Sequence, residues 1–156
     1  MKIKLLLMAL ISIGGLSSCG KNETIVNLYE QPLSVIQKAV QGEWKLQYSE
    51  GGYAYRKIID TLDSYMYISE NHIIMGNAHG IYVDSPIIWM KGEPFGGDLS
   101  AYLLTYNHGI DITEQDGVIL EEVPIYNTLV PYQIKNGTLA ISDVCCDGYS
   151  YYYTKQ

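Results

Sequence analysis

The sequence predicts an all-β fold: an antiparallel, up-and-down arrangement of eight to nine strands behind one short N-terminal helix. Two observations predict it. Short runs rich in β-branched and aromatic residues follow one another along most of the chain, and dipeptides such as Asn136-Gly137 and Asp147-Gly148 separate some of them. Many short strands with regularly spaced turns are typical of a sandwich or a barrel.

The helix is expected between Pro32 and Gly42. Leu33, Ile36 and Val40 recur at the spacing of one helical face. Proline suits the first turn of a helix and glycine suits its end. The segment therefore predicts a short amphipathic helix with one buried side.

The first strand follows the helix directly. Trp44, Leu46 and Tyr48 alternate with polar residues, which indicates a strand with one buried face. The later strand-like runs are 64–69, 72–75, 80–84, 86–90, 101–107, 118–123, 127–134, 138–141 and 149–154.

Three longer segments between these runs are expected to be loops: 50–63, 91–98 and the polar stretch 108–117. A long loop such as 50–63 is often a lid or a binding loop. Tyr53, Tyr55 and Arg56 are therefore candidates for the rim of a binding site.

The N-terminus has the pattern of an export signal. Lys2 and Lys4 precede a twelve-residue apolar run, which is too short to cross a bilayer and suits the core of a signal peptide. Small residues then lead to Cys19, as in a bacterial lipobox, where the cysteine is acylated and becomes the new N-terminus. The expected organisation is a lipoprotein signal peptide at 1–18, a lipidated tether at 19–31 and one domain at 32–156.

Charge and composition exclude two classes of protein. The 156 residues include 10 Lys and Arg against 17 Asp and Glu, a net charge of −7, and 47% of them are hydrophobic. This apolar content argues against a disordered chain. The acidic balance gives no electrostatic basis for binding nucleic acid. Loss of residues 1–18 would remove two lysines and leave a charge of −9, so the acyl anchor alone would hold the domain at a membrane.

The two remaining cysteines, Cys145 and Cys146, are adjacent. A disulfide between neighbours would be strained, because their Cα atoms lie closer together than a disulfide usually spans. Two interpretations are open. The cysteines form a redox-labile vicinal disulfide, or they are two small residues at a strand end, one on each face.

At this point the sequence resembles the lipocalin and calycin group, and in particular the small lipocalin-like lipoproteins of Gram-negative anaerobes. The resemblance rests on the short helix leading into Gly42-Glu43-Trp44, on the long first loop and on the antiparallel meander after it. It implies a barrel whose floor is closed by Trp44, with a basic residue from the last strand packed over it. Lys155 is the matching position, although arginine is usual there.

No pattern for catalysis or metal binding is present. The three histidines lack ligand spacing, and there is no nucleophile motif such as Gly-x-Ser-x-Gly. The segment 111–117 resembles a calcium loop, but its glycine falls at the seventh position instead of the sixth. We therefore expect no catalytic residues, no metal and no cofactor, and the chain is not expected to be an enzyme.

The unusual feature is tyrosine, with 15 residues against one Phe and two Trp. Tyrosine combines a flat apolar body with a polar tip. Tyrosine stripes that face a cavity would suit a small amphipathic or apolar ligand, whereas stripes that face outward would be ordinary strand residues. The candidate ligand contacts are Tyr65, Tyr67, Trp89, Tyr102 and Tyr106.

Two functions follow from this pattern. The first is a ligand-binding lipoprotein of the cell envelope, anchored in the outer membrane. The second is an envelope accessory module with a filled barrel, which docks a protein partner and holds no ligand.

Overall fold

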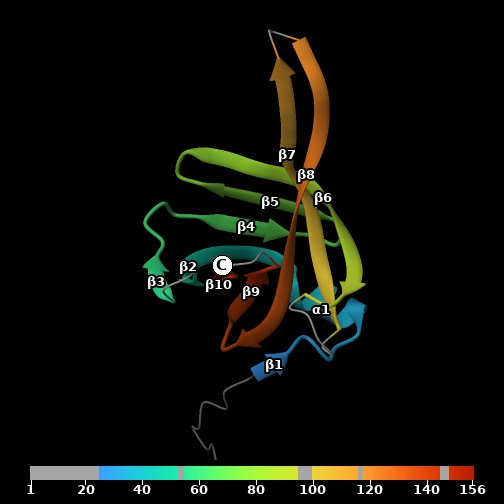
Figure 1. Cartoon of the computed structure of the whole chain (residues 1–156). Helices are drawn as coiled ribbons and strands as arrows, with labels where there is room; N and C mark the ends of the chain where they lie inside the picture. Colours follow the sequence, from blue (N-terminus) through green and yellow to red (C-terminus); the bar gives the residue numbers. More distant parts are fainter. Residues whose placement is uncertain (1–24, 53–54, 95–99, 116–117, 145–147) are drawn as a thin grey trace, which may run out of the picture.

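The computed structural model describes residues 25–52, 55–94, 100–115, 118–144 and 148–156 (Figure 1). Most of the described residues are in strands, and the described part holds one helix. The helix is α1 (Leu33–Val40). The strands are β1 (Ile25–Asn27), β2 (Gly42–Gly51), β3 (Arg56–Ile59), β4 (Tyr65–Ile68), β5 (His72–Asn77), β6 (Gly80–Gly92), β7 (Ala101–Gln115), β8 (Val118–Lys135), β9 (Thr138–Asp143) and β10 (Tyr149–Lys155). The expected all-β class with one short helix is confirmed.

Eight of the strands form a closed ring. The hydrogen-bonded order is β8-β7-β6-β5-β4-β2-β10-β9, and β9 pairs back onto β8. Every pair in the ring is antiparallel. The other two strands lie outside it: β1 pairs with β8, and β3 pairs with β2. Closure removes the free edges on which a sheet would otherwise aggregate.

Helix α1 packs against one end of the ring, as its apolar spacing predicts. Ile36 and Val40 are buried on the expected face. The indole Nε1–H of Trp44 donates a 2.7 Å hydrogen bond to the carbonyl of Val40, which joins the last turn of the helix to the start of β2. Leu28 is also fully buried in the same core, so the segment before the helix helps to close this end.

Alternation along the strands divides the ring into an inner and an outer face. In β4, Met66 and Ile68 are buried, and Tyr65 and Tyr67 between them are exposed. The neighbouring strand β5 buries Ile73 in the same core. The inner faces of β4 and β5 therefore contribute isoleucine and methionine side chains to the core of the ring.

The strand boundaries differ from the expectation in several places. The runs 80–84 and 86–90 form one strand, β6, because Ser85 is buried and the ladder passes through it. The expected runs 118–123 and 127–134 also form one strand, β8. The expected loop 50–63 contains β3, which forms a hairpin with β2. Its apolar residues Ile58 and Ile59 are more than half exposed. The strand therefore lacks the alternation of buried and exposed residues from which a strand can be predicted.

The largest difference is in the polar stretch 108–117, which was expected to be a loop. As far as Gln115 it is part of strand β7. Strand β7 runs through it and pairs with β8 as far as Gln115 and Val118, so that the two strands rise from the ring as a long hairpin, here called the arm (Figure 1). Ladder irregularities at 107–109 and 113–114 interrupt the simple alternation that marks a strand. The segment that superficially resembles a calcium loop lies within this strand as far as Gln115.

Candidate functional site

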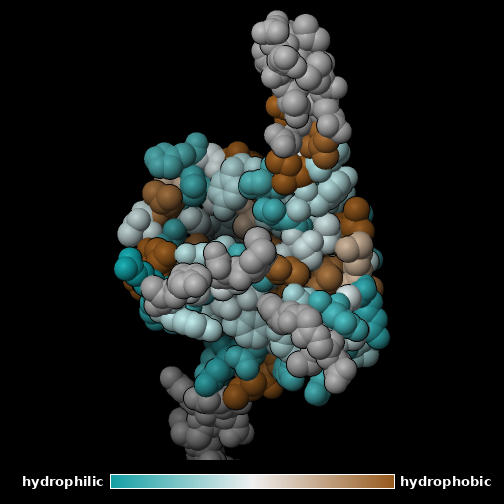
Figure 2. All heavy atoms as spheres, viewed as in Figure 1, coloured by the Kyte–Doolittle hydropathy of each residue, from teal (hydrophilic) through white to brown (hydrophobic). Residues whose placement is uncertain are grey.

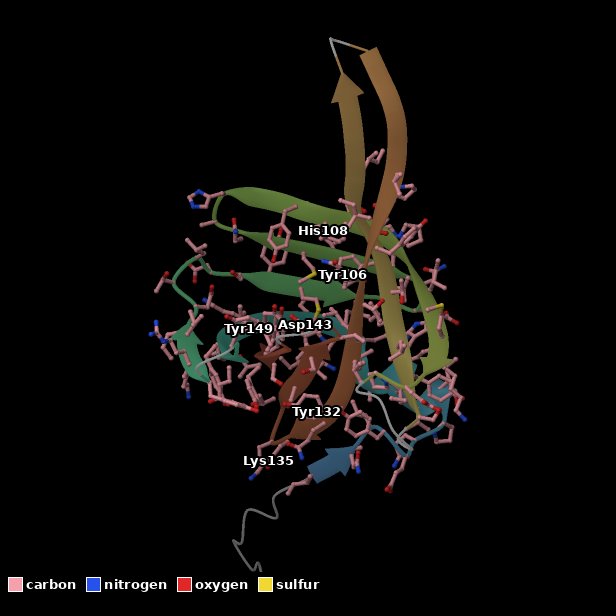
Figure 3. All side chains as sticks on the ribbon, in the orientation of Figure 1. Tyr106, His108, Tyr132, Lys135, Asp143 and Tyr149 are labelled. Atoms are coloured by element: carbon pink, nitrogen blue, oxygen red, sulfur yellow. The ribbon has the colours of Figure 1, made fainter. Side chains whose placement is uncertain are left out.

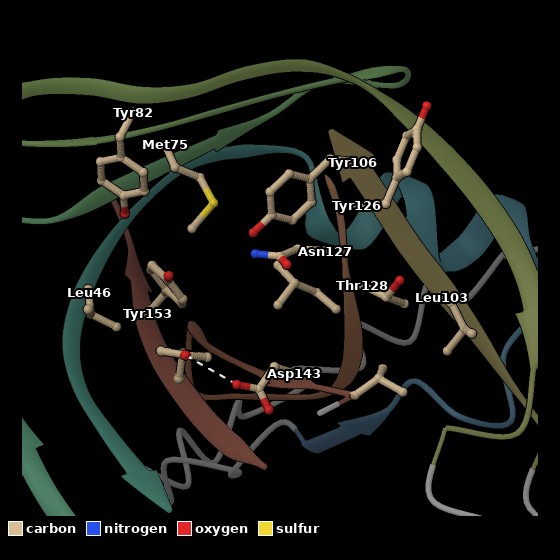
Figure 4. Close-up of a pocket in the computed structure, with 13 residues that line it drawn as sticks. Leu46, Met75, Tyr82, Leu103, Tyr106, Tyr126, Asn127, Thr128, Asp143 and Tyr153 are labelled. Carbon is tan, nitrogen blue, oxygen red and sulfur yellow. Dashed lines mark hydrogen bonds between the residues drawn. The ribbon is translucent and has the colours of Figure 1, made fainter. Parts of the chain in front are cut away.

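A pocket of about 570 Å³ opens inside the ring, at the end from which the arm rises (Figure 4). Seven strands of the ring supply its walls, with one residue that directly follows β9. Strands β7 to β10, from the second half of the chain, supply most of the lining residues. The lining residues are Leu46, Met75, Tyr82, Leu103, Tyr106, Tyr126, Asn127, Thr128, Leu129, Asp143, Val144, Tyr151 and Tyr153. Volumes of 300–1,000 Å³ are usual for small-molecule sites.

Five tyrosines line the pocket from four strands. Tyr82 comes from β6, Tyr106 from β7, Tyr126 from β8, and Tyr151 and Tyr153 from β10. Figure 4 shows the rings of Tyr82, Tyr106 and Tyr153 around the interior of the ring, together with Met75. The wall therefore combines aromatic faces with phenol hydroxyls.

Burial favours the neutral form of four of these tyrosines. Burial raises the pKa of Tyr82, Tyr151 and Tyr153 above the ordinary value, and Asp143 adds to the effect on Tyr151. For Tyr106, burial again raises the pKa, and a hydrogen bond with Asn127 partly opposes this. All four phenols are neutral at physiological pH and can donate or accept a hydrogen bond.

Asp143 is the carboxylate of the pocket, and β10 holds it in place. The backbone N–H of Tyr149 donates to Oδ1 at 2.9 Å. The hydroxyl of Tyr151 donates to Oδ2 at 3.3 Å, the bond drawn as a dashed line in Figure 4. Figure 3 shows Asp143 and Tyr149 close together within the ring, with Tyr106 above them. Both oxygens have an internal partner, and each keeps room for another donor.

Of the five tyrosine and tryptophan residues expected to contact a ligand, Tyr106 lines the pocket. Tyr65 and Tyr67 lie on the outer face of β4 with 37% and 39% of their surface exposed. The phenol of Tyr65 covers Gly76 of the adjacent strand, where a Cβ would lie 2.4 Å from the hydroxyl oxygen. These two residues are outside the pocket.

Trp89 and Tyr102 are half-buried against the main core and are not among the lining residues. The indole nitrogen of Trp89 is buried without a hydrogen-bond partner among the described residues. Lys91 reaches to 6.0 Å from the ring centre of Tyr102. Their expected role as ligand contacts stays a prediction without geometric support from this pocket.

The structure brings Gly42, Trp44 and Lys155 together at the end of the ring opposite the pocket. Trp44 is 1% exposed, and the ammonium of Lys155 lies 5.4 Å from its ring centroid. Gly42 has a φ of +125°, and a Cβ there would lie 3.1 Å from Cε of Lys155. Glycine therefore permits both the backbone conformation and the close approach of the lysine.

The remaining candidates lie elsewhere. Tyr55 is 92% exposed and Arg56 is exposed on β3, and neither lines the pocket. Tyr53, Cys19, Cys145 and Cys146 fall outside the described residues.

The sequence did not single out Tyr82, Asp143, Tyr151 and Tyr153 as a site. The signal for the β10 pair was present, since Tyr151 and Tyr153 share a face, but Tyr152 gives the opposite face the same character. In the structure Tyr152 faces outward, where it stacks on Tyr48 with ring centroids 4.4 Å apart and receives a hydrogen bond from Tyr132. The tyrosine excess therefore serves both faces of the sheet.

Two further findings come from the described residues alone. They contain no group of three His, Cys, Asp or Glu side chains arranged to hold a metal ion. None of their helices is long and apolar enough to cross a membrane.

Comparison with known proteins adds no relative: no protein-family model, curated protein or solved structure matches the chain significantly.

Proposed function

We propose that this protein is a lipocalin-like lipoprotein that binds a small amphipathic or apolar molecule in its interior pocket. The pocket carries the proposal. Its volume of about 570 Å³ suits a small ligand, and its walls combine aliphatic side chains with a few polar groups. An interior filled by side chains would leave no such space, so the pocket favours the ligand-binding hypothesis over a filled module.

Several features support a lipocalin-like barrel. The ring has eight antiparallel strands, a number that leaves room for one small ligand. A short helix leads into Gly42-Glu43-Trp44, and Lys155 packs over the tryptophan. These features correspond to the closed floor and capping residue that the resemblance implies.

Attachment to the outer membrane would come from Cys19. The apolar run and small residues before it have the lipobox pattern, and the residues between Cys19 and β1 would serve as the tether, since β1 and Leu28 pack against the ring. Acyl chains anchor by burying methylene groups, and more than one chain holds firmly. The pocket would then collect its ligand close to a bilayer.

A second candidate function is docking of an envelope protein, and the arm favours it. Its apolar side chains Ile110, Ile112, Val123 and Ile125 are each more than 40% exposed. Figure 2 shows apolar side chains gathered where the arm leaves the ring. An arm of this kind could add strands to a partner. Shortening the arm should then remove a cross-linked partner from intact cells without changing ligand content.

The pocket is tested by identifying what it holds. The acylated full-length chain would be purified from membranes in a mild detergent and extracted with organic solvent, and the extract would be analysed by mass spectrometry. Leu46→Trp places an indole in the pocket, and Ile88→Trp places one on a half-exposed position outside it. We expect one molecular species to be enriched with wild type and Ile88→Trp and lost with Leu46→Trp.

Equal extracts from all three proteins would contradict ligand binding and favour the docking hypothesis. Thermal unfolding of each variant must show a cooperative transition. If Leu46→Trp does not fold, Met75→Trp on a different wall of the pocket supplies the same block.

A further inference from the structure

The described lining of the pocket contains an acidic side chain and no basic one. Asp143 is an acid, and none of the described lining residues is Lys, Arg or His. The other polar groups are the phenols, Asn127 and Thr128, which carry no charge in their ordinary forms. The wall thus presents one anionic group without a cationic side chain beside it.

The protein orients Asp143 and leaves part of its hydrogen-bonding capacity unused. One hydrogen bond from the Tyr149 backbone and one from the Tyr151 hydroxyl fix its two oxygens. A carboxylate has about four acceptor sites, so two bonds leave capacity for a donor in the pocket. The side chain of Asp143 is half-buried, so its attraction for a charged donor in the pocket is stronger than it would be in water.

Aromatic rings stand around the same space. Tyr106 is 5% exposed and Tyr153 is 4% exposed, and both rings border the pocket. The negative face of an aromatic ring attracts a cation that approaches its centre. An anionic ligand would meet the carboxylate and these faces without any positive partner.

We propose that the pocket selects amphipathic molecules whose polar end is an ammonium group, with Asp143 as its counter-ion and the tyrosine rings around it. This inference rests on the proposed ligand-binding function and names the class of ligand. An ammonium offers both charge and several donors to a carboxylate, and charged hydrogen bonds are about twice as strong as neutral ones. The net charge of −7 on the whole chain also favours the approach of cations.

The test is a competition among ligands with one tail and three head groups. The full-length acylated chain in mild detergent is mixed with equal amounts of dodecylammonium, dodecanol and dodecanoate at neutral pH. Gel filtration and mass spectrometry then measure the amount of each that stays with the protein. Leu46→Trp, or Met75→Trp, treated in the same way gives the amount held by the detergent micelle.

After this subtraction we expect dodecylammonium to exceed each of the other two by about tenfold, the ratio that one charged hydrogen bond supplies. Asp143→Asn keeps an acceptor for Tyr149 and removes the charge, so the preference should fall to near unity. Asp84→Asn changes an exposed acid outside the pocket and should leave the preference as in wild type.

The outcomes separate the two proposals. If wild type retains no more of any tail than the blocked variant, ligand binding fails and this inference fails with it. If the tails are retained but dodecanol or dodecanoate equals dodecylammonium, ligand binding holds and the ammonium assignment is overturned. A preference that survives Asp143→Asn also overturns it.

The same ammonium occurs on free amines and on ethanolamine head groups. A further arm adds lysophosphatidylethanolamine, which carries the ammonium beside a phosphate. Retention equal to that of dodecylammonium supports a lipid head group, and weaker retention supports a free amine.

Discussion

The ammonium of Lys155 lies 5.4 Å from the ring centroid of Trp44, and these residues join the last strand of the chain to the first strand of the ring. Trp44 also donates a hydrogen bond to Val40 in α1. One indole therefore connects the helix, β2 and β10 at the closed end. The opposite end keeps the pocket, so the packing of the ring is polarised along its axis.

Replacing Trp44 with alanine should destabilise the protein by about 3–5 kcal/mol, because it removes a large buried side chain and leaves a cavity. Denaturant unfolding followed by circular dichroism measures the change. Tyr55→Ala, at a position 92% exposed, is the control and should stay within about 0.5 kcal/mol of wild type. A near-neutral Trp44→Ala would mean that the closed end does not depend on this residue.

Local signals predicted this end of the molecule well. The face of α1, the alternation of Trp44 and Leu46 and the Asn136-Gly137 turn each depend on a few neighbouring residues, and all three occur in the structure. The expectation that Tyr48 shares the buried face is wrong, because the ladder between β2 and β10 shifts register there and Tyr48 stacks on Tyr152 outside the ring. Such features follow from helical spacing, strand period and backbone conformation, which short segments determine by themselves.

The site could not be predicted in the same way, because it depends on which face of each strand turns inward. Tyr65 and Tyr67 alternate with Met66 and Ile68, and both sets are apolar enough to be buried. Asp143 reaches the pocket only because β9 pairs with both β8 and β10 and closes the ring. The inward face of each strand and the closure of the ring are determined by pairing between distant segments, which cannot be recognised in a short stretch of sequence.

The turn between β8 and β9 offers a matched test of backbone conformation. Gly137 has a φ of +78°, and a Cβ at this position would meet nothing within 4 Å. Gly109 has the same open space without a positive φ. Gly137→Ala should therefore cost about 1 kcal/mol, and Gly109→Ala should be neutral or slightly stabilising. Equal effects in denaturant unfolding would show that the φ angle at 137 is not limiting.

Cys19 is predicted to carry the acyl anchor. Cys19→Ala should abolish incorporation of labelled palmitate and release the protein from the membrane fraction, since the acyl chains supply the binding energy. Cys145→Ala is the matched control and should leave labelling intact. Labelling that persists in Cys19→Ala would rule out the lipoprotein assignment.

The arm should be separable from the ring. Removing 110–123 and joining the strands with Asn-Gly keeps Tyr106 and Asn127, which border the pocket at the base of the arm. We expect unfolding free energy within about 1 kcal/mol of wild type, because an isolated two-stranded hairpin contributes little stability of its own. Loss of the cooperative transition would instead make the arm part of the folding unit.

The buried tyrosines should make the protein sensitive to alkali. Burial holds the pKa of Tyr153 above its ordinary value of about 10, so the folded state keeps a proton that the unfolded state releases as pH rises past 10. This contribution to stability is therefore fully present below pH 10 and is lost as pH rises toward the folded pKa, at up to about 1.4 kcal/mol per pH unit for one group. Tyr153→Phe should flatten the fall in unfolding free energy above pH 10. Tyr55→Phe tests whether loss of any tyrosine hydroxyl has this effect, and the same slope in wild type and Tyr153→Phe would refute the assignment to Tyr153.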